Sequence, residues 1–267
     1  MLSDPVLESG APSRCLPDAS DFTAPIRISL AAPAFNEEGG IRPVVESWHR
    51  YLAARRDIET FEIVICNDGS RDATGAILEA LASEHREVRP IQFPRNQGAA
   101  AALAAAIAAT SLNWVLLIDS DGQFPIENLE NMLNTMRRLQ VPAVIGIRQK
   151  KAHFFARFGT SASGLVCNLV HGSSIRDFNS AFKLVWGPFL RMLTFEAKGL
   201  NYSTEVTSRL LECRVPIAEV EIEHRPRTSG TSSMRMLRGA THRLLFVAYI
   251  GMRQLLLKVG VLRRPLS

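Results

Sequence analysis

Cysteine is scarce in this sequence, and its placement offers no framework for disulfides or for a metal. Cys15, Cys66, Cys167 and Cys213 are the four cysteines among 267 residues, and none belongs to a Cys-x-x-Cys pair. Cys66 and Cys167 stand in apolar surroundings. This pattern disfavours a disulfide-stapled scaffold and favours a reducing, cytosolic compartment.

A secretory start and a long uninterrupted apolar run are also lacking. Residues 1–25 contain four prolines and four acidic side chains without a basic start, so we expect a disordered N-terminal tail rather than a signal peptide. Residues 99–118 are apolar, but alanine dominates them, and Thr110, Ser111 and Asn113 break the run into a helix, a turn and a strand. We therefore expect no membrane-spanning helix.

Acidic residues are missing from the last part of the chain. Residues 224–267 contain nine Arg or Lys and no Asp or Glu, although the formal net charge of the whole chain is +5. A segment of this kind favours anionic partners. Residues 235–264 are largely apolar with interspersed basic side chains, which is typical of an amphipathic helix in a membrane interface. The alternative is a C-terminal helix that docks on the core or on a second subunit of a homo-oligomer.

What the chain does contain is a regular alternation of apolar runs and helical patterns. The runs that we expect to form strands cover residues 27–35, 61–66, 88–93, 113–119, 141–147 and 215–224. The helical patterns cover residues 41–55, 73–85, 98–110, 125–139, 157–172 and 201–213. Strands that alternate with helices predict an α/β domain with a mostly parallel sheet flanked by helices. We expect a tail at 1–25, one main domain at 26–234 and a basic amphipathic helix at 235–267.

Three side chains with oxygen atoms follow the fourth predicted strand. Asp119, Asp121 and Gln123 alternate along an extended segment, so they should lie on one side at the carboxyl edge of the sheet. In parallel sheets ligands bind beyond that edge. Oxygen ligands at this density suit Mg²⁺ or Mn²⁺, which usually leave room for substrate phosphates. The segment therefore predicts metal-assisted chemistry on a phosphate-bearing substrate.

Two enzyme classes place an Asp-x-Asp after a strand. Haloacid-dehalogenase-like phosphatases use the first Asp as nucleophile, but there the motif normally lies on the first strand and continues with Thr or Val. Here it follows the fourth strand and continues with Gln123, which favours the nucleotide-sugar glycosyltransferases. A dinucleotide oxidoreductase is disfavoured because no Gly-x-Gly-x-x-Gly follows the first strand.

The earlier strand ends support the glycosyltransferase reading. The first strand ends in "APAFNEEGG" (32–40), the second in "ICNDGSRDAT" (65–74), and "RNQG" (95–98) precedes an Ala-rich helix. Together with the Asp-x-Asp, these motifs resemble family 2 of the inverting glycosyltransferases, whose usual sequence pattern is P-x-x-N-E followed by D-D-G-S-x-D-x-T. The resemblance implies a GT-A fold. Asn67 stands where many relatives have Asp, which puts the choice of donor in question.

Later motifs narrow the resemblance to one branch. Asp-x-Asp-x-Gln, "GIRQ", "RFGTSASGLVCN", "DFNSAFK" and "RTSGTSS" resemble the polyprenyl-phosphate sugar transferases, such as dolichyl-phosphate mannose synthases and undecaprenyl-phosphate glycosyltransferases. The resemblance covers about residues 26–235. It implies metal-dependent transfer from GDP-mannose or a UDP-sugar to a polyprenyl phosphate, by a cytoplasmic enzyme attached peripherally to the inner face of the plasma membrane. It implies no nucleic-acid partner.

The resemblance also implies roles for individual residues. The metal ligands would be Asp119, Asp121 and Gln123, and the catalytic set Asp119, Asp121, Arg148 and Arg227. The nucleotide-binding set would be Pro33, Phe35, Asn36, Glu37, Asp68, Ser70, Gly98, Asp119 and Ser120. The acceptor-side set would be Asp177, Ser180, Lys183, Arg227 and Ser232. Carboxylates suit the hydroxyls and imide edge of a nucleotide, and planar Arg side chains suit its phosphates.

This sequence departs from the usual pattern of these relatives at two motifs, which leaves the identity of the acceptor undecided. Relatives often have Ser-Gly-Phe-Arg where this chain has "SAFK" (180–183), and Gly-x-Ser-Lys where it has "GTSS" (230–233). The second change removes a cation, which Arg235 or Arg238 could replace. A phosphate acceptor needs no protein base because its oxygen is already anionic. A hydroxyl acceptor would need a carboxylate to remove its proton, and Asp177 and Glu205 are the candidates.

Overall fold

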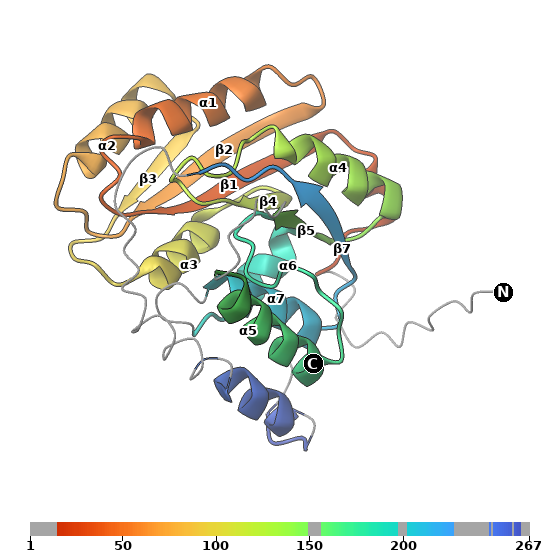
Figure 1. Ribbon diagram of the computed structural model, residues 1–267. Helices are drawn as coiled ribbons and strands as arrows, with labels where there is room; N and C mark the ends of the chain where they lie inside the picture. Colours follow the sequence, from red (N-terminus) through yellow and green to blue (C-terminus); the bar gives the residue numbers. More distant parts are fainter. Residues whose placement is uncertain are drawn as a thin grey trace.

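A computed structural model describes residues 15–148, 156–196, 202–226, 246, 248–257 and 259–262, with the backbone alone for 156–163. It contains a seven-stranded sheet with helices on both faces (Figure 1). The strands are β1 (Ile26–Ala34), β2 (Ile58–Asn67), β3 (Val88–Gln92), β4 (Trp114–Leu117), β5 (Ala143–Arg148), β6 (Lys183–Trp186) and β7 (Ile217–Ile222). The predicted α/β fold with a mostly parallel sheet is confirmed.

The order of the strands brings the expected motifs to one edge. The order is β3-β2-β1-β4-β6-β5-β7, and β6 is antiparallel to both of its neighbours while the other pairs are parallel. Six strands therefore point the same way. Their carboxyl ends, with the loops that carry the motifs, lie at the same edge of the sheet.

The helices form two layers. They are α1 (Ile41–Ala53), α2 (Thr74–Glu84), α3 (Ala99–Ala109), α4 (Asn128–Leu139), α5 (Ala156–His171), α6 (Gly187–Met192) and α7 (Tyr202–Glu212). In Figure 1, α1, α2 and α4 cover one face of the sheet, and α3, α5, α6 and α7 cover the other. In α1 the buried side chains Ile41, Val45, Trp48 and Leu52 recur every third or fourth residue, which gives the helix one apolar stripe toward the sheet.

Strand β6 was missed because its pattern is not that of a half-exposed strand. All four of its residues are buried, including Lys183, so apolar and polar side chains do not alternate. The strand is only four residues long and lies between β4 and β5, which are neighbours in sequence order. Lys183 is also the last residue of the "DFNSAFK" motif, which indicated a site rather than the start of a strand.

The expectation of a disordered tail at 1–25 is wrong for its second half. Residues 19–22 form a short 3-10 helix, and Phe22 is buried, with its ring 5.9 Å from that of Trp114. Cys15 is buried as well. Prolines and acidic residues dominate the composition of the segment, but two apolar side chains are enough to hold it against the core. Residues 1–14 lie outside the described part.

The described part of the C-terminal region, which comprises residues 246, 248–257 and 259–262, docks on the domain. Phe246 and Ile250 form a second buried cluster with Cys167 of α5 and Phe178. Arg253 donates a hydrogen bond of 3.2 Å to Glu212 of α7. The alternative of a docked helix is therefore what the described residues adopt. No helix among them is long and apolar enough to cross a membrane.

Candidate active site

The loops after β1 and β2 interlock through hydrogen bonds from backbone amides of one loop to side chains of the other. The amide of Asn36 donates to the Ser70 hydroxyl at 2.9 Å, and the Asn36 side chain accepts from the amide of Arg71 at 2.9 Å. The amide of Glu37 donates to the Thr74 hydroxyl at 2.8 Å. Asn36 has a φ of 53°, a left-handed conformation that Asn tolerates better than most residues. These bonds hold the predicted nucleotide-binding residues Asn36, Glu37 and Ser70 together at the carboxyl edge.

Asp68 organises a third loop. Its carboxylate accepts hydrogen bonds from the Asn96 side chain at 2.9 Å and from the amides of Gln97 and Gly98 at 2.7 and 2.9 Å. The carboxylate is therefore the anchor of the "RNQG" loop. It still has acceptor capacity, since two carboxylate oxygens offer about four lone-pair sites. Its contact with a nucleotide stays a prediction.

The Asp-x-Asp segment is tied to β1 and to the chain that follows β7. The Ser120 hydroxyl donates to the carbonyl of Pro33 in β1 at 2.7 Å. On the other side, the amide of Arg225 donates to the carbonyl of Gln123 at 2.8 Å, and the Gln123 side chain donates to the carbonyl of Arg225 at 3.4 Å. The segment is thus held between the end of β1 and the chain after β7.

Asp119 and Asp121 lie close enough to repel each other. Burial and, to a smaller extent, the charge of Asp121 raise the pKa of Asp119 to about 6, against the opposing effect of nearby donors and cations. Within the described residues, hydrogen bonds engage one oxygen of each: Tyr202 donates to Oδ1 of Asp119, and the amide of Gln123 donates to Oδ1 of Asp121 at 3.1 Å. A divalent cation bound to the remaining oxygens would offset this repulsion.

The donor set fits a cation that shares its coordination sphere with substrate. Across the described ranges, no group of three or more His, Cys, Asp or Glu side chains is placed to hold a metal. The predicted set is instead two carboxylates and the Gln123 amide. Such an incomplete set suits Mg²⁺ or Mn²⁺, which take phosphate oxygens and water as further ligands.

A cluster of charges lies beside the carboxylates. Arg148 donates from Nε and Nη2 to the two oxygens of Asp177, both at 2.8 Å. Burial by itself would raise the pKa of Asp177, but the hydrogen bonds and charge of Arg148 outweigh it and lower that pKa. Lys183 is fully buried and donates to the carbonyl of Ser180. Burial lowers the pKa of Lys183 to about 7.

The structure brings most of the predicted residues together, with differences in exposure. Pro33, Phe35, Asn36, Glu37, Asp68, Ser70 and Gly98 belong to the three interlocked strand ends and loops. Ser180 and Lys183 are fully buried, so they lie beneath the edge and not on an accessible acceptor surface. Arg227 and Ser232 lie outside the described residues.

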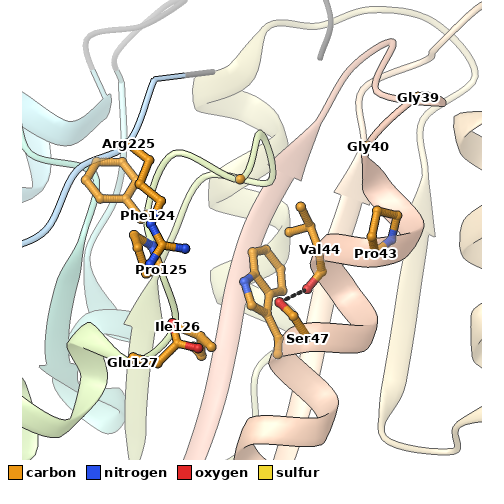
Figure 2. A pocket seen from close by; sticks show the side chains of 12 residues that line it. Gly39, Gly40, Pro43, Val44, Ser47, Phe124, Pro125, Ile126, Glu127 and Arg225 are labelled. Carbon is orange, nitrogen blue, oxygen red and sulfur yellow. Dashed lines mark hydrogen bonds between the residues drawn. The ribbon is translucent and has the colours of Figure 1, made fainter. Parts of the chain in front are cut away.

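Sequence reasoning missed two residues and a groove. Tyr202 and Arg225 contact the Asp-x-Asp segment, but neither belongs to a motif that could have indicated it. A groove of about 370 Å³ opens beside Gly122, between α1 and the loop before α4. Figure 2 shows Val44 and Ser47 of α1 on one side of it and Phe124, Pro125 and Arg225 on the other. The Asp-x-Asp segment therefore borders a partly apolar groove on the α1 side.

Comparison with known proteins agrees with this geometry. Residues 29–177 match the family described as Glycosyl transferase family 2, which is more than half of the chain. The chain belongs to glycosyl transferase family 2. The matched region contains the interlocked loops, the Asp-x-Asp segment and Arg148. The predicted family is confirmed, and the phosphatase alternative is excluded.

The curated relatives of this family 2 protein include enzymes named for lipid acceptors. A dolichyl-phosphate beta-glucosyltransferase of Trichomonas vaginalis is 29% identical over 199 residues, which cover 68% of this chain and 60% of that protein. A bactoprenol glucosyl transferase of Shigella phage SfX is 41% identical over 108 residues, which cover 40% of this chain and 35% of that protein. The chain thus spans 60% or less of the length of these relatives.

Solved structures with the same fold include a transferase with a soluble product. Glucosyl-3-phosphoglycerate synthase from Mycobacterium tuberculosis, in complex with Mn²⁺, UDP and glucosyl-3-phosphoglycerate, superposes with a TM-score of 0.66 at 20% identity. The match covers 88% of this family 2 chain and 82% of that one. At this identity the likeness establishes the fold alone.

Proposed function

We propose that this protein is an inverting glycosyltransferase that moves a sugar from a nucleoside-diphospho-sugar to the phosphate of a polyprenyl lipid. Family membership supports sugar transfer, and the relatives named for dolichyl phosphate and bactoprenol support the lipid acceptor. Both names specify a glucosyl group, so a glucose-bearing nucleotide is the first donor to test.

A divalent cation would be held by Asp119, Asp121 and Gln123. The M. tuberculosis synthase has been solved with Mn²⁺ or Mg²⁺ together with UDP, which supports the same use of a metal here. When bound, the cation supplies positive charge that stabilises the departing nucleoside diphosphate. The charge of Arg148 also acts on Asp119, whose pKa it lowers, and the five donors of Arg148 are not exhausted by the two bonds to Asp177.

The observation that carries the choice of acceptor is the state of the two candidate bases. Asp177 is paired on both oxygens with Arg148, and its lowered pKa makes it a weak base. Glu205 is buried and accepts from Arg209 at 3.0 Å and from the amide of Glu196 at 2.8 Å. Neither carboxylate is arranged to take a proton from an acceptor. An acceptor that is already anionic, such as a lipid phosphate, needs no base.

The reaction is then a single displacement. An oxygen of the lipid phosphate forms a bond to the anomeric carbon while the bond from that carbon to the nucleoside diphosphate breaks, and the configuration inverts. Because no proton is transferred to the protein, its residues act by positioning and by electrostatic stabilisation.

The test is transfer of the labelled sugar from UDP-glucose in the presence of Mn²⁺ or Mg²⁺, with labelled GDP-glucose and GDP-mannose as alternative donors for comparison. A short polyprenyl phosphate is compared with the same polyprenol, which offers a hydroxyl in place of the phosphate. We expect a chloroform-soluble labelled product with the polyprenyl phosphate and none with the polyprenol. Equal product with the alcohol, or a labelled product that forms only with a soluble acceptor, would contradict the proposal and favour the hydroxyl-acceptor alternative.

The enzyme would meet its lipid by associating peripherally with the inner face of the plasma membrane. Among the described residues nine large apolar side chains are exposed. Seven of them belong either to α5 or to the C-terminal segment that begins at Phe246: Leu165, Val166, Leu169, Met252, Leu255, Val259 and Val261. The two segments are in contact, since Phe246 and Ile250 pack against Cys167. Residues 224–267 add nine cations and no carboxylate, which suits an anionic membrane surface.

A further inference from the structure

Tyr202 connects a helix from the second half of the chain to the Asp-x-Asp segment. It is the first residue of α7, and its hydroxyl donates to Oδ1 of Asp119, which is 83 positions away in the sequence. The side chain is buried, with 8% of its surface exposed. A buried phenol hydroxyl needs a partner, and here the partner is the carboxylate expected to hold the cation.

The helix that carries Tyr202 is firmly anchored. Val206 and Leu210 of α7 belong to the main hydrophobic core. The Thr207 hydroxyl donates to the carbonyl of Phe178 at 3.1 Å, and Arg209 is buried and paired with Glu205 and Glu212 at 3.0 and 3.1 Å. Because the helix is fixed by both apolar packing and ion pairs, the Tyr202 hydroxyl has little freedom to leave Asp119.

The hydrogen bond determines which oxygen of Asp119 remains for a cation. A donor on Oδ1 restrains rotation of the carboxylate and leaves Oδ2 as the oxygen without a bond from the described residues. Groups that orient a metal ligand in this way typically change metal affinity or activity about 10–100-fold when they are removed. Phenylalanine would fill the same space in the core, so packing alone does not require the hydroxyl.

We propose that Tyr202 is a positioning residue for the metal site, which orients Asp119 through its hydroxyl and so sets the affinity for the divalent cation. The inference rests on the proposed use of a metal by Asp119 and Asp121. Tyr202 lies outside the region matched by the family, residues 29–177, so the proposal extends the site beyond the motif residues.

The test is Mn²⁺ binding to the full chain, measured from the loss of the free Mn²⁺ electron paramagnetic resonance signal with and without UDP. Tyr202→Phe should weaken Mn²⁺ binding about 10–100-fold. The matched control is Tyr249→Phe, which also removes a hydroxyl that donates to a carboxylate, that of Glu196. It should leave the affinity unchanged, and thermal melts should show both variants folded.

A double-mutant cycle separates positioning from general loosening of the fold. If Tyr202 acts through Asp119, Tyr202→Phe should weaken Mn²⁺ binding in the natural chain and add little in an Asp119→Asn background. The proposal would be overturned if Tyr202→Phe weakened Mn²⁺ binding by the same factor in both backgrounds. It would also be overturned if Tyr202→Phe alone bound Mn²⁺ as tightly as the natural chain does. If the natural chain itself fails to bind Mn²⁺ with UDP present, the proposed metal site is wrong, and so is the proposed role of Tyr202. Lipid-product assays report on the acceptor independently.

Discussion

At the scale of single residues, the site is governed by charges that lie close together. Asp119 and Asp121 repel each other, while Arg148 pairs with Asp177 and Lys183 lies buried beside them. Asp177 is already neutralised by Arg148, whereas Asp119 and Asp121 are the two carboxylates that we propose to hold a cation. The two predictions at this scale each change one charge.

Asp121→Asn should remove a metal ligand and keep the shape of the side chain. We expect metal-dependent sugar transfer to fall by about 100-fold or more, because the leaving diphosphate loses its stabilisation. Initial rates over a range of Mn²⁺ concentrations measure the effect, and circular dichroism checks that the fold is intact. Unchanged turnover in a folded variant would remove Asp121 from the metal site.

Lys183 should make stability depend on pH in the alkaline range. Its pKa falls from 10.5 to about 7 on folding, so between these values the unfolded chain binds more protons than the folded chain. The free energy of unfolding contributed by this residue therefore rises with pH across that window and is lowest near pH 7.

Lys183→Met should remove this dependence. The variant should gain stability over the natural chain, and the gain should be about 2 kcal/mol larger at pH 7.5 than at pH 9.5, since each pH unit in the window corresponds to about 1.4 kcal/mol. Urea denaturation at the two pH values measures the gain. A gain that is the same at both would show that Lys183 keeps an ordinary pKa in the fold.

At the scale of elements, the site depends on loops that fit closely against each other. Gly69 has a φ of 63°, and a Cβ atom there would lie 2.3 Å from the carbonyl carbon of Arg95. The loop after β2 and the "RNQG" loop therefore touch backbone to backbone. Asp68 beside it adds three hydrogen bonds across the same contact.

Gly69→Ala should force these loops apart. We expect a loss of stability of at least about 1 kcal/mol from the left-handed backbone alone, and weaker UDP binding by calorimetry. Gly164→Ala is the control, because a Cβ there meets nothing within 4 Å and the residue is helical. It should be neutral or slightly stabilising. Equal melting temperatures and UDP affinities for the two variants would contradict the close fit.

Prediction from sequence succeeded for elements with a strong local period and failed where tertiary context decides. The six parallel strands, the helices α1 to α5 and helix α7 have apolar runs or stripes that are visible along the chain. Strand β6 carries a buried lysine and four residues with no alternation, so no local period marks it. In residues 15–25, Cys15 and Phe22 are buried against the core. Two apolar residues hardly change the composition of a segment rich in proline and acidic residues, so the composition did not predict this contact.

At the scale of the whole molecule, apolar side chains from distant parts of the sequence gather on adjoining elements. Cys167 of α5 and Phe246 of the C-terminal segment are 79 positions apart in the sequence and share one buried cluster. Leu139, by contrast, is an exposed leucine at the end of α4, and Figure 1 shows α4 on the other face of the sheet from α5. This difference allows the proposed membrane face to be tested without truncating the chain.

The double variant Leu165→Glu/Leu169→Glu should reduce flotation with anionic liposomes roughly tenfold or more, because about 1.5–3 kcal/mol is lost for each leucine that no longer enters an apolar phase. Leu139→Glu should float like the natural chain. Equal flotation of all three proteins would show that α5 does not contact the membrane, and flotation that persists after deletion of residues 240–267 would exclude the C-terminal segment as well.

The sequence by itself determined the fold class, the family and the strand ends at which chemistry occurs, because each depends on contiguous motifs and local periods. Three contacts became visible in the folded chain alone: Arg148 neutralises Asp177, Lys183 is buried, and Tyr202 donates to Asp119. These contacts join residues 29 and 83 positions apart or depend on burial from all sides. No local pattern encodes which distant donor reaches a carboxylate, since that depends on how the helices pack on the sheet.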